Sequence, residues 1–151
     1  VNGAVSAYMA QLTTTCPATA VSYGAGCTGS GGLNVLTATS LPWIGSAFRS
    51  IATSMPVNSL VLSVLGLSTV SIPLSTILPS PAGCKLLVSP DLLDLYLPTA
   101  SSVQTQVPLP NTLALVGQVI HQQVVPVELS GLGGITALTS TNALSLTIGS
   151  F

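Results

Sequence analysis

Apolar and polar positions alternate along most of the chain in short runs, and Gly or Pro separates one run from the next. The chain has 14 Gly and 11 Pro, and Val, Ile, Ser and Thr fill much of the rest. These residues favour pleated or turn backbone over helix. Runs of about 5–10 residues between turns are typical of a β-sandwich or barrel. Alternation predicts strands over residues 33–39, 46–53, 59–66, 84–88, 92–97, 102–107, 116–128, 134–139 and 142–148.

The regions between these runs are less regular. Residues 60–65 are almost continuously apolar, which predicts a strand covered on both faces. Residues 67–83 contain three Pro and predict an irregular loop with at most one short strand. Residues 17–32 are rich in Gly and Ser and predict a connector. A short helix over residues 91–96 is the one helical alternative.

We therefore predict an all-β protein with one β-sandwich, of jelly-roll or immunoglobulin-like type, over residues 21–151. Residues 1–20 form an N-terminal arm in this division. As an extended strand, the arm has two fairly apolar faces, one with Ala4, Tyr8, Ala10 and Leu12 and the other with Val5, Ala7 and Met9. The alternative is a first strand that folds back on its own sandwich.

Charge is scarce, and this narrows the range of functions. Charged residues make up 3% of the chain, the formal net charge is -1 and the mean hydropathy is +0.76, whereas about a quarter of the residues in an ordinary domain are charged. Little repulsion keeps copies apart, so we expect self-association. Disorder requires the opposite composition, no window is apolar enough to span a membrane, and two basic residues cannot neutralise a nucleic-acid backbone. Because no basic leader precedes an apolar segment at residue 1, we expect any signal peptide to have been removed.

The candidates for chemistry are few. His121 is the only imidazole, and its neighbours Gln118, Gln122 and Gln123 suggest the polar face of a strand rather than a catalytic triad. Residues 24–29 match the letters of a dinucleotide fingerprint but lack the helix and the acid that the fingerprint needs. Asp91 and Asp94 are too few for a calcium site, and one His with three scattered Cys cannot make a zinc site. We predict no enzyme, no cofactor and no metal.

Two further features concern covalent chemistry. Three Cys permit one internal bridge and one remaining thiol, which points to a compartment outside the cytosol. No Asn lies in an N-glycosylation sequon, whereas residues 13–15 are three consecutive Thr that are candidates for O-linked sugar.

An ordered set of short motifs resembles a secreted bacterial β-sandwich module. The motifs span residues 21–149 and lie at residues 23–27 (YGAGC), 29–32, 41–45, 65–68, 83–88 (GCKLLV), 108–111, 115–117, 122–123 and 140–149 (STNALSLTIG). The resemblance implies an extracellular or cell-surface location and a disulfide between Cys27 and Cys84. Cys16 is then unpaired, locally bridged or intermolecular.

The chain is almost bare module plus arm, and in this it resembles subunits of donor-strand-assembled, pilus-like extracellular filaments. We therefore expect a structural, fimbria-like subunit on the bacterial surface that forms a head-to-tail homopolymer, each arm docking into the neighbouring protomer. The alternative is a surface- or carbohydrate-binding module of a secreted protein.

Overall fold

The structure is a computed structural model that describes residues 16–151. In this range the chain forms thirteen β-strands and two single 3-10 turns, Leu74–Thr76 and Leu113–Leu115, and no α-helix. The predicted all-β class is therefore confirmed.

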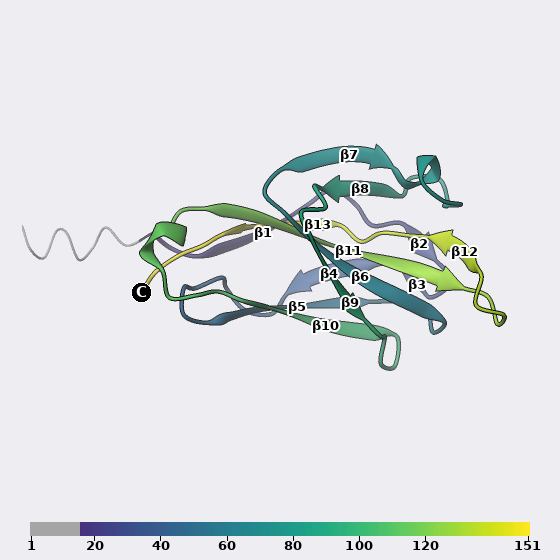
Figure 1. Cartoon of the computed structure of the whole chain (residues 1–151), viewed down its shortest axis with the longest axis horizontal. Coiled ribbons are helices and arrows are strands. Elements are labelled where there is room, and N and C mark those ends of the chain that lie inside the picture. Colours follow the sequence, from purple (N-terminus) through teal and green to yellow (C-terminus); the bar gives the residue numbers. More distant parts are fainter. Residues whose placement is uncertain (1–15) are drawn as a thin grey trace, which may run out of the picture.

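Three layers of strands make up the molecule (Figure 1). The central layer, here called the main sheet, contains in spatial order β1 (Thr19–Tyr23), β13 (Ala143–Thr147), β11 (Val119–Leu129), β6 (Ser59–Gly66) and β9 (Leu92–Tyr96), and β12 (Ile135–Leu138) also pairs with β11. The small sheet on one side contains β10 (Ser102–Pro108), β5 (Ala47–Thr53) and β4 (Val35–Ala38). The outer ribbon on the other side contains β7 (Thr69–Pro73) and β8 (Lys85–Val88). A short two-stranded ribbon consists of β2 (Thr28–Gly29) and β3 (Gly32–Leu33).

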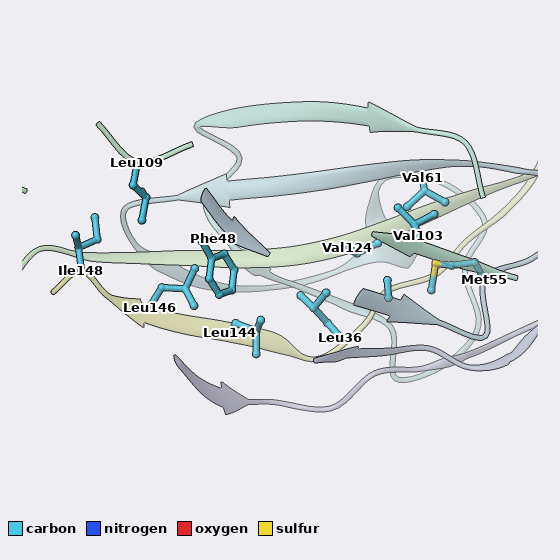
Figure 2. Packing of buried hydrophobic residues seen from close by; sticks show 11 residues of the cluster. Leu36, Phe48, Met55, Val61, Val103, Leu109, Val124, Leu144, Leu146 and Ile148 are labelled. Carbon is cyan, nitrogen blue, oxygen red and sulfur yellow. The ribbon is translucent and has the colours of Figure 1, made fainter. Parts of the chain in front are cut away.

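Two apolar clusters lie on opposite faces of the main sheet. Figure 2 shows the first, between the main sheet and the small sheet, where Phe48 and Leu36 meet Leu146 and Val124. The second cluster packs the outer ribbon against the other face. Neighbouring residues of a strand point to opposite faces, and β6 therefore supplies Val61 to the first cluster and Val64 to the second. This confirms that residues 60–65 form a strand covered on both faces.

The N-terminal part of the sandwich differs from the prediction. Strand β1 begins at Thr19, inside the segment assigned to the arm, and continues into the segment assigned to a connector. It pairs antiparallel with β13, from Thr19 opposite Thr147 to Tyr23 opposite Ala143. All five of its residues are half-buried or exposed. A strand without a buried face needs no apolar alternation, so the sequence signal is weak there. Residues 92–96 form a strand and not the alternative helix, and β7 is the one short strand of the predicted loop.

The polar strand face expected around His121 is wrong for Gln122 and Gln123, because both side chains are fully buried. Gln122 lies between the two sheets. Its Oε1 accepts a hydrogen bond from the Ser50 hydroxyl, and its Nε2 donates to the hydroxyls of Ser63 and Thr105. A buried amide is tolerated in a core only when it is satisfied in this way.

Gln123 points to the opposite face and ties the outer ribbon to the main sheet. Its Oε1 accepts from the Leu87 backbone N–H at 2.8 Å. Its Nε2 donates to the carbonyls of Lys85 and Thr141. The two adjacent glutamines therefore hold two different layers against the main sheet.

A disulfide joins Cys27 to Cys84, with 5.1 Å between the Cα atoms, and this is the bridge that the resemblance implied. It links the segment before β2 to the start of β8 and belongs to the second apolar cluster. Next to the bridge, Gly26 lets the chain pass close to the backbone of Asn34, since a Cβ there would collide with the Asn34 carbonyl. The Cys27 backbone N–H donates to the Ser140 carbonyl at 2.9 Å, so two of the motifs, YGAGC and STNAL, meet in space.

Candidate docking edge

Strand β9 forms one edge of the main sheet and presents an apolar surface to solvent. It pairs with β6 along one side, from Leu92 opposite Leu65 to Tyr96 opposite Val61. Along its other side, no strand within residues 16–151 pairs with it, and the outward N–H and C=O groups there are a template for an added strand. Four leucines on or directly after this strand are between 52% and 71% exposed: Leu92, Leu93, Leu95 and Leu97.

Large apolar side chains lie on both faces of this edge, and Asp94 lies between Leu92 and Tyr96 on one of them. Leu93 and Leu95 pair with Val64 and Leu62 and therefore share the face that carries the outer ribbon. Leu92 and Tyr96 lie on the face toward the small sheet. Natural edge strands are usually protected by Lys, by Pro or by a bulge. Here prolines stand only outside the strand, at positions 90 and 98, and Asp94 is its single charge.

An apolar hollow adjoins the start of β9. Its volume is about 220 Å³, and it lies between the main sheet and the end of β10, lined by Leu65, Leu67, Leu92, Val107 and Ile120 together with Gly66 and Asp91. Asp91 closes the turn beside it, because one carboxylate oxygen accepts from the Leu67 backbone N–H and from the Ser89 hydroxyl, both at 2.8 Å. These bonds lower the pKa of Asp91, the backbone bond most. The hollow thus has an apolar lining and a hydrogen-bonded turn at its margin.

On the side of the sandwich opposite β9, one side chain bridges the edges of the two sheets. There β1 and β4 are the edges of the two sheets, and the Asn142 side chain lies between them. Its Oδ1 accepts from the Leu36 backbone N–H at 2.8 Å, and its Nδ2 donates to the Leu36 carbonyl and to the Ser22 hydroxyl. Asn142 thus occupies backbone groups of β4 that an added strand would need. No such side chain covers the outer side of β9 in the part of the chain that the structure describes.

A second, polar hollow lies over the small sheet. It measures about 630 Å³ and is lined by Thr39, Ser40, Arg49, Gln104, Gln106 and Tyr96, with Ser50 and Thr105 at its base. Hydroxyl, amide and guanidinium groups converge there with one aromatic ring, which is a composition that suits a polar ligand.

His121 is a structural residue of β11. Its ring meets the ring of Tyr23 edge-on, with 5.7 Å between the centroids, and its Nδ1 is buried with no hydrogen-bond partner within residues 16–151. Burial lowers the pKa of His121 and raises that of Tyr23, because both charged forms lose solvation. The predicted strand histidine therefore packs against an aromatic ring.

The lowered pKa of His121 predicts a loss of stability in mild acid. Between the folded pKa and the ordinary value of 6.5, the unfolded chain binds a proton that the folded chain does not. The free energy of unfolding should therefore fall as the pH drops below about 6.5. Urea denaturation at a series of pH values from 7.5 to 5 measures this. The variant His121→Gln should have a flatter profile in that range, and an unchanged slope in the variant would contradict the assignment.

The remaining predicted site residues are placed as follows. Cys16 is exposed and has a free thiol, and its carbonyl accepts from the Ser150 backbone N–H. Trp43 stacks on Phe151, with 4.4 Å between the ring centroids, at a corner of the sandwich. Residues 24–29 form a turn and the start of the β2–β3 ribbon. The arm positions Ala4, Val5, Ala7, Tyr8, Met9, Ala10 and Leu12 and the Thr run 13–15 lie outside the described residues.

Comparisons with protein-family models, with curated proteins and with solved structures find no match, so the resemblance stays a prediction. Within residues 16–151, no helix is long and apolar enough to cross a membrane. In the same range, no three His, Cys, Asp or Glu side chains gather as metal ligands would.

Proposed function

We propose that the chain is the structural subunit of an extracellular homopolymeric filament, in which the N-terminal arm of one protomer docks into its neighbour. The observation that carries the proposal is the unpaired edge of β9 with its four exposed leucines. An exposed apolar edge of this kind is an association site in folded proteins. A net charge of -1 opposes association very little.

The arm has the composition of a partner for such an edge. Residues 1–15 contain no Asp, Glu, Lys or Arg, and apolar side chains lie on both faces when residues 4–12 are extended. An extended peptide that joins a sheet edge gains main-chain hydrogen bonds and side-chain contacts on both faces. Because the donor and acceptor surfaces differ, the contact repeats from copy to copy without closing, which makes a fibre.

The disulfide and the free thiol constrain how the subunits are joined. Cys27 and Cys84 are bridged to each other, and the chain's third cysteine is Cys16. A disulfide between copies would therefore have to join two Cys16 residues, and a head-to-tail contact does not bring identical residues together. The proposed filament is accordingly held by non-covalent docking, and an intermolecular disulfide through Cys16 is not part of the proposal.

Electron microscopy of the purified full-length chain tests the function. At concentrations well above those used for folding measurements, the chain should form fibres of uniform width and regular repeat, visible in negative stain. The same fibres should form in reducing buffer mild enough to leave the Cys27–Cys84 bridge intact, and with Cys16→Ser. A chain that stays monomeric under all these conditions would rule the function out.

The polar hollow over the small sheet supports a second candidate, a carbohydrate-binding module. Tyr96 offers a ring to stack against, and Arg49, Gln104 and Gln106 offer hydrogen bonds. A glycan array probed with the monomeric chain would distinguish the two functions, since specific glycan binding lost on Tyr96→Ala supports the module. The filament is favoured because the hollow has one aromatic ring, whereas the β9 edge carries four exposed leucines.

A further inference from the structure

We infer that the docking site is the outer edge of β9, and that residues 4–12 of a second copy add to it as an extra strand of the main sheet. This inference rests on the proposed filament function and deepens it by naming the acceptor. Apart from the short strand β12, whose Leu138 backbone N–H already donates to the Pro79 carbonyl, the two sheets offer four edges for an added strand, at β1, β9, β4 and β10. These edges differ in chemistry.

Three of the four edges are less suitable. The backbone of β4 at Leu36 is already bonded to the side chain of Asn142. Strand β10 has polar Gln104 and Gln106 facing outward and ends in Pro108, which cannot donate to a ladder. Strand β1 is also an edge, but Thr19 and Ser22 interrupt its apolar positions. Only β9 combines an open edge with large apolar side chains on both faces.

The chain geometry requires the strand to come from another copy. Strands β1 and β9 are at opposite edges of the main sheet, four inter-strand steps apart, which is about 19 Å at the usual strand spacing. A strand added beyond β9 lies one step farther, at about 24 Å. Cys16 precedes β1 directly, and the four Cα–Cα steps from Leu12 to Cys16 reach at most about 14 Å. Leu12 therefore cannot reach the β9 edge of its own protomer, and a strand that includes all of residues 4–12 has to come from another copy.

The two faces of the arm match the two faces of β9. Val5, Ala7 and Met9 make an apolar run, which ends at Gln11 on the same face and suits the side of β9 that carries Leu93 and Leu95. The other face then turns toward the small sheet, where the apolar hollow beside Leu92 has room for a large side chain such as Tyr8 or Leu12. The Tyr8 hydroxyl on this face is also compatible with Asp94, the one charge on β9.

A charge placed on β9 tests the acceptor edge. Leu95→Lys puts an ammonium on the exposed apolar face, where docking of the arm would bury it at high cost. We expect this variant to remain folded, with wild-type thermal unfolding, and to lose all pelletable fibre. The matched control is Val21→Lys, which changes an equally exposed apolar residue on the β1 edge and should assemble as the wild type does.

Cross-linking tests the partner directly. In a Cys16→Ser background, Ala7→Cys on the arm is combined with Leu95→Cys on β9, or with Val21→Cys on β1. A bifunctional thiol reagent of moderate span is then added to the assembled chain. The inference predicts a ladder of covalent oligomers with the β9 pair and none with the β1 pair. A ladder or an internal cross-link with the β1 pair would overturn it, and so would dimers from Leu95→Cys alone, which indicate that β9 pairs with another β9.

The results distinguish a failure of the filament function from a failure of the assignment of the β9 edge. If the wild-type chain makes no fibres, the filament function fails. If fibres form and Leu95→Lys assembles normally, the function stands and the assignment of the β9 edge is wrong.

Discussion

Deletion of residues 1–15 is expected to abolish ordered fibres while leaving the sandwich folded. Among residues 16–151, the buried members of the two apolar clusters come from Cys27 onward, so circular dichroism and the Cys27–Cys84 bridge should be unchanged. Assembly should fail because the β9 edge of each copy has lost its strand. Negative-stain images and sedimentation of the deleted chain measure this, and ordered fibres that persist without the arm would contradict it.

The free energy of docking explains why deletion of the arm should abolish fibres completely. Burial of an apolar area on the order of 600 Å² stabilises docking by roughly 15 kcal/mol, while ordering about ten residues costs roughly 10–15 kcal/mol. Main-chain hydrogen bonds to β9 add about 1 kcal/mol each. The net free energy of docking is small relative to both the gain from burial and the cost of ordering, so the loss of one side chain has a large effect on assembly.

Met9→Asp should therefore impair assembly severely, whereas Thr14→Asp, outside residues 4–12, should not.

Removal of the Cys27–Cys84 disulfide is the second large expected effect. The bridge closes a loop with a sequence separation of 57, and the unfolded chain without it gains entropy worth roughly 4 kcal/mol. The double variant Cys27→Ala/Cys84→Ala should lose about that much free energy of unfolding, which is a large part of the stability of a typical domain. Chemical denaturation measures the loss.

Cys16→Ser is the matched control for the disulfide. Its thiol is exposed and unbridged, and surface substitutions usually change stability by about 0.5 kcal/mol or less. A double variant that loses less than about 1 kcal/mol would show that the loop is already restricted in the unfolded chain.

Much of the fold followed from alternation, because alternation reflects a property of each strand alone. Residues 59–66 were predicted as a strand and form β6 with the same bounds, and 46–53 and 142–148 bracket β5 and β13 closely. Strand β1 was missed because an edge strand with half-exposed residues needs no apolar face. Its existence depends on pairing with β13, more than one hundred positions later.

The candidate site was less predictable, because it too depends on contacts between strands that are distant in the sequence. Gln122 and Gln123 look like surface residues in the sequence, and only the hydroxyls and carbonyls brought to them by other strands make their burial possible. Asn142 likewise bridges β4 and β1 through bonds that no local pattern indicates. The leucines of β9 resemble those of β6 in sequence, and their exposure depends on which strand is last in the sheet. The polar residues of the motif at 140–144 indicated that hydrogen bonds to other strands exist, but not which residues take part in them.

The most direct test of the account is a structure of the assembled chain by electron cryo-microscopy. We predict that residues 4–12 of each protomer form a strand hydrogen-bonded to Leu92–Tyr96 of the next protomer, with large arm side chains in the hollow beside Leu92. A structure in which residues 4–12 pair within their own protomer, and in which no sheet edge is shared between chains, would contradict it.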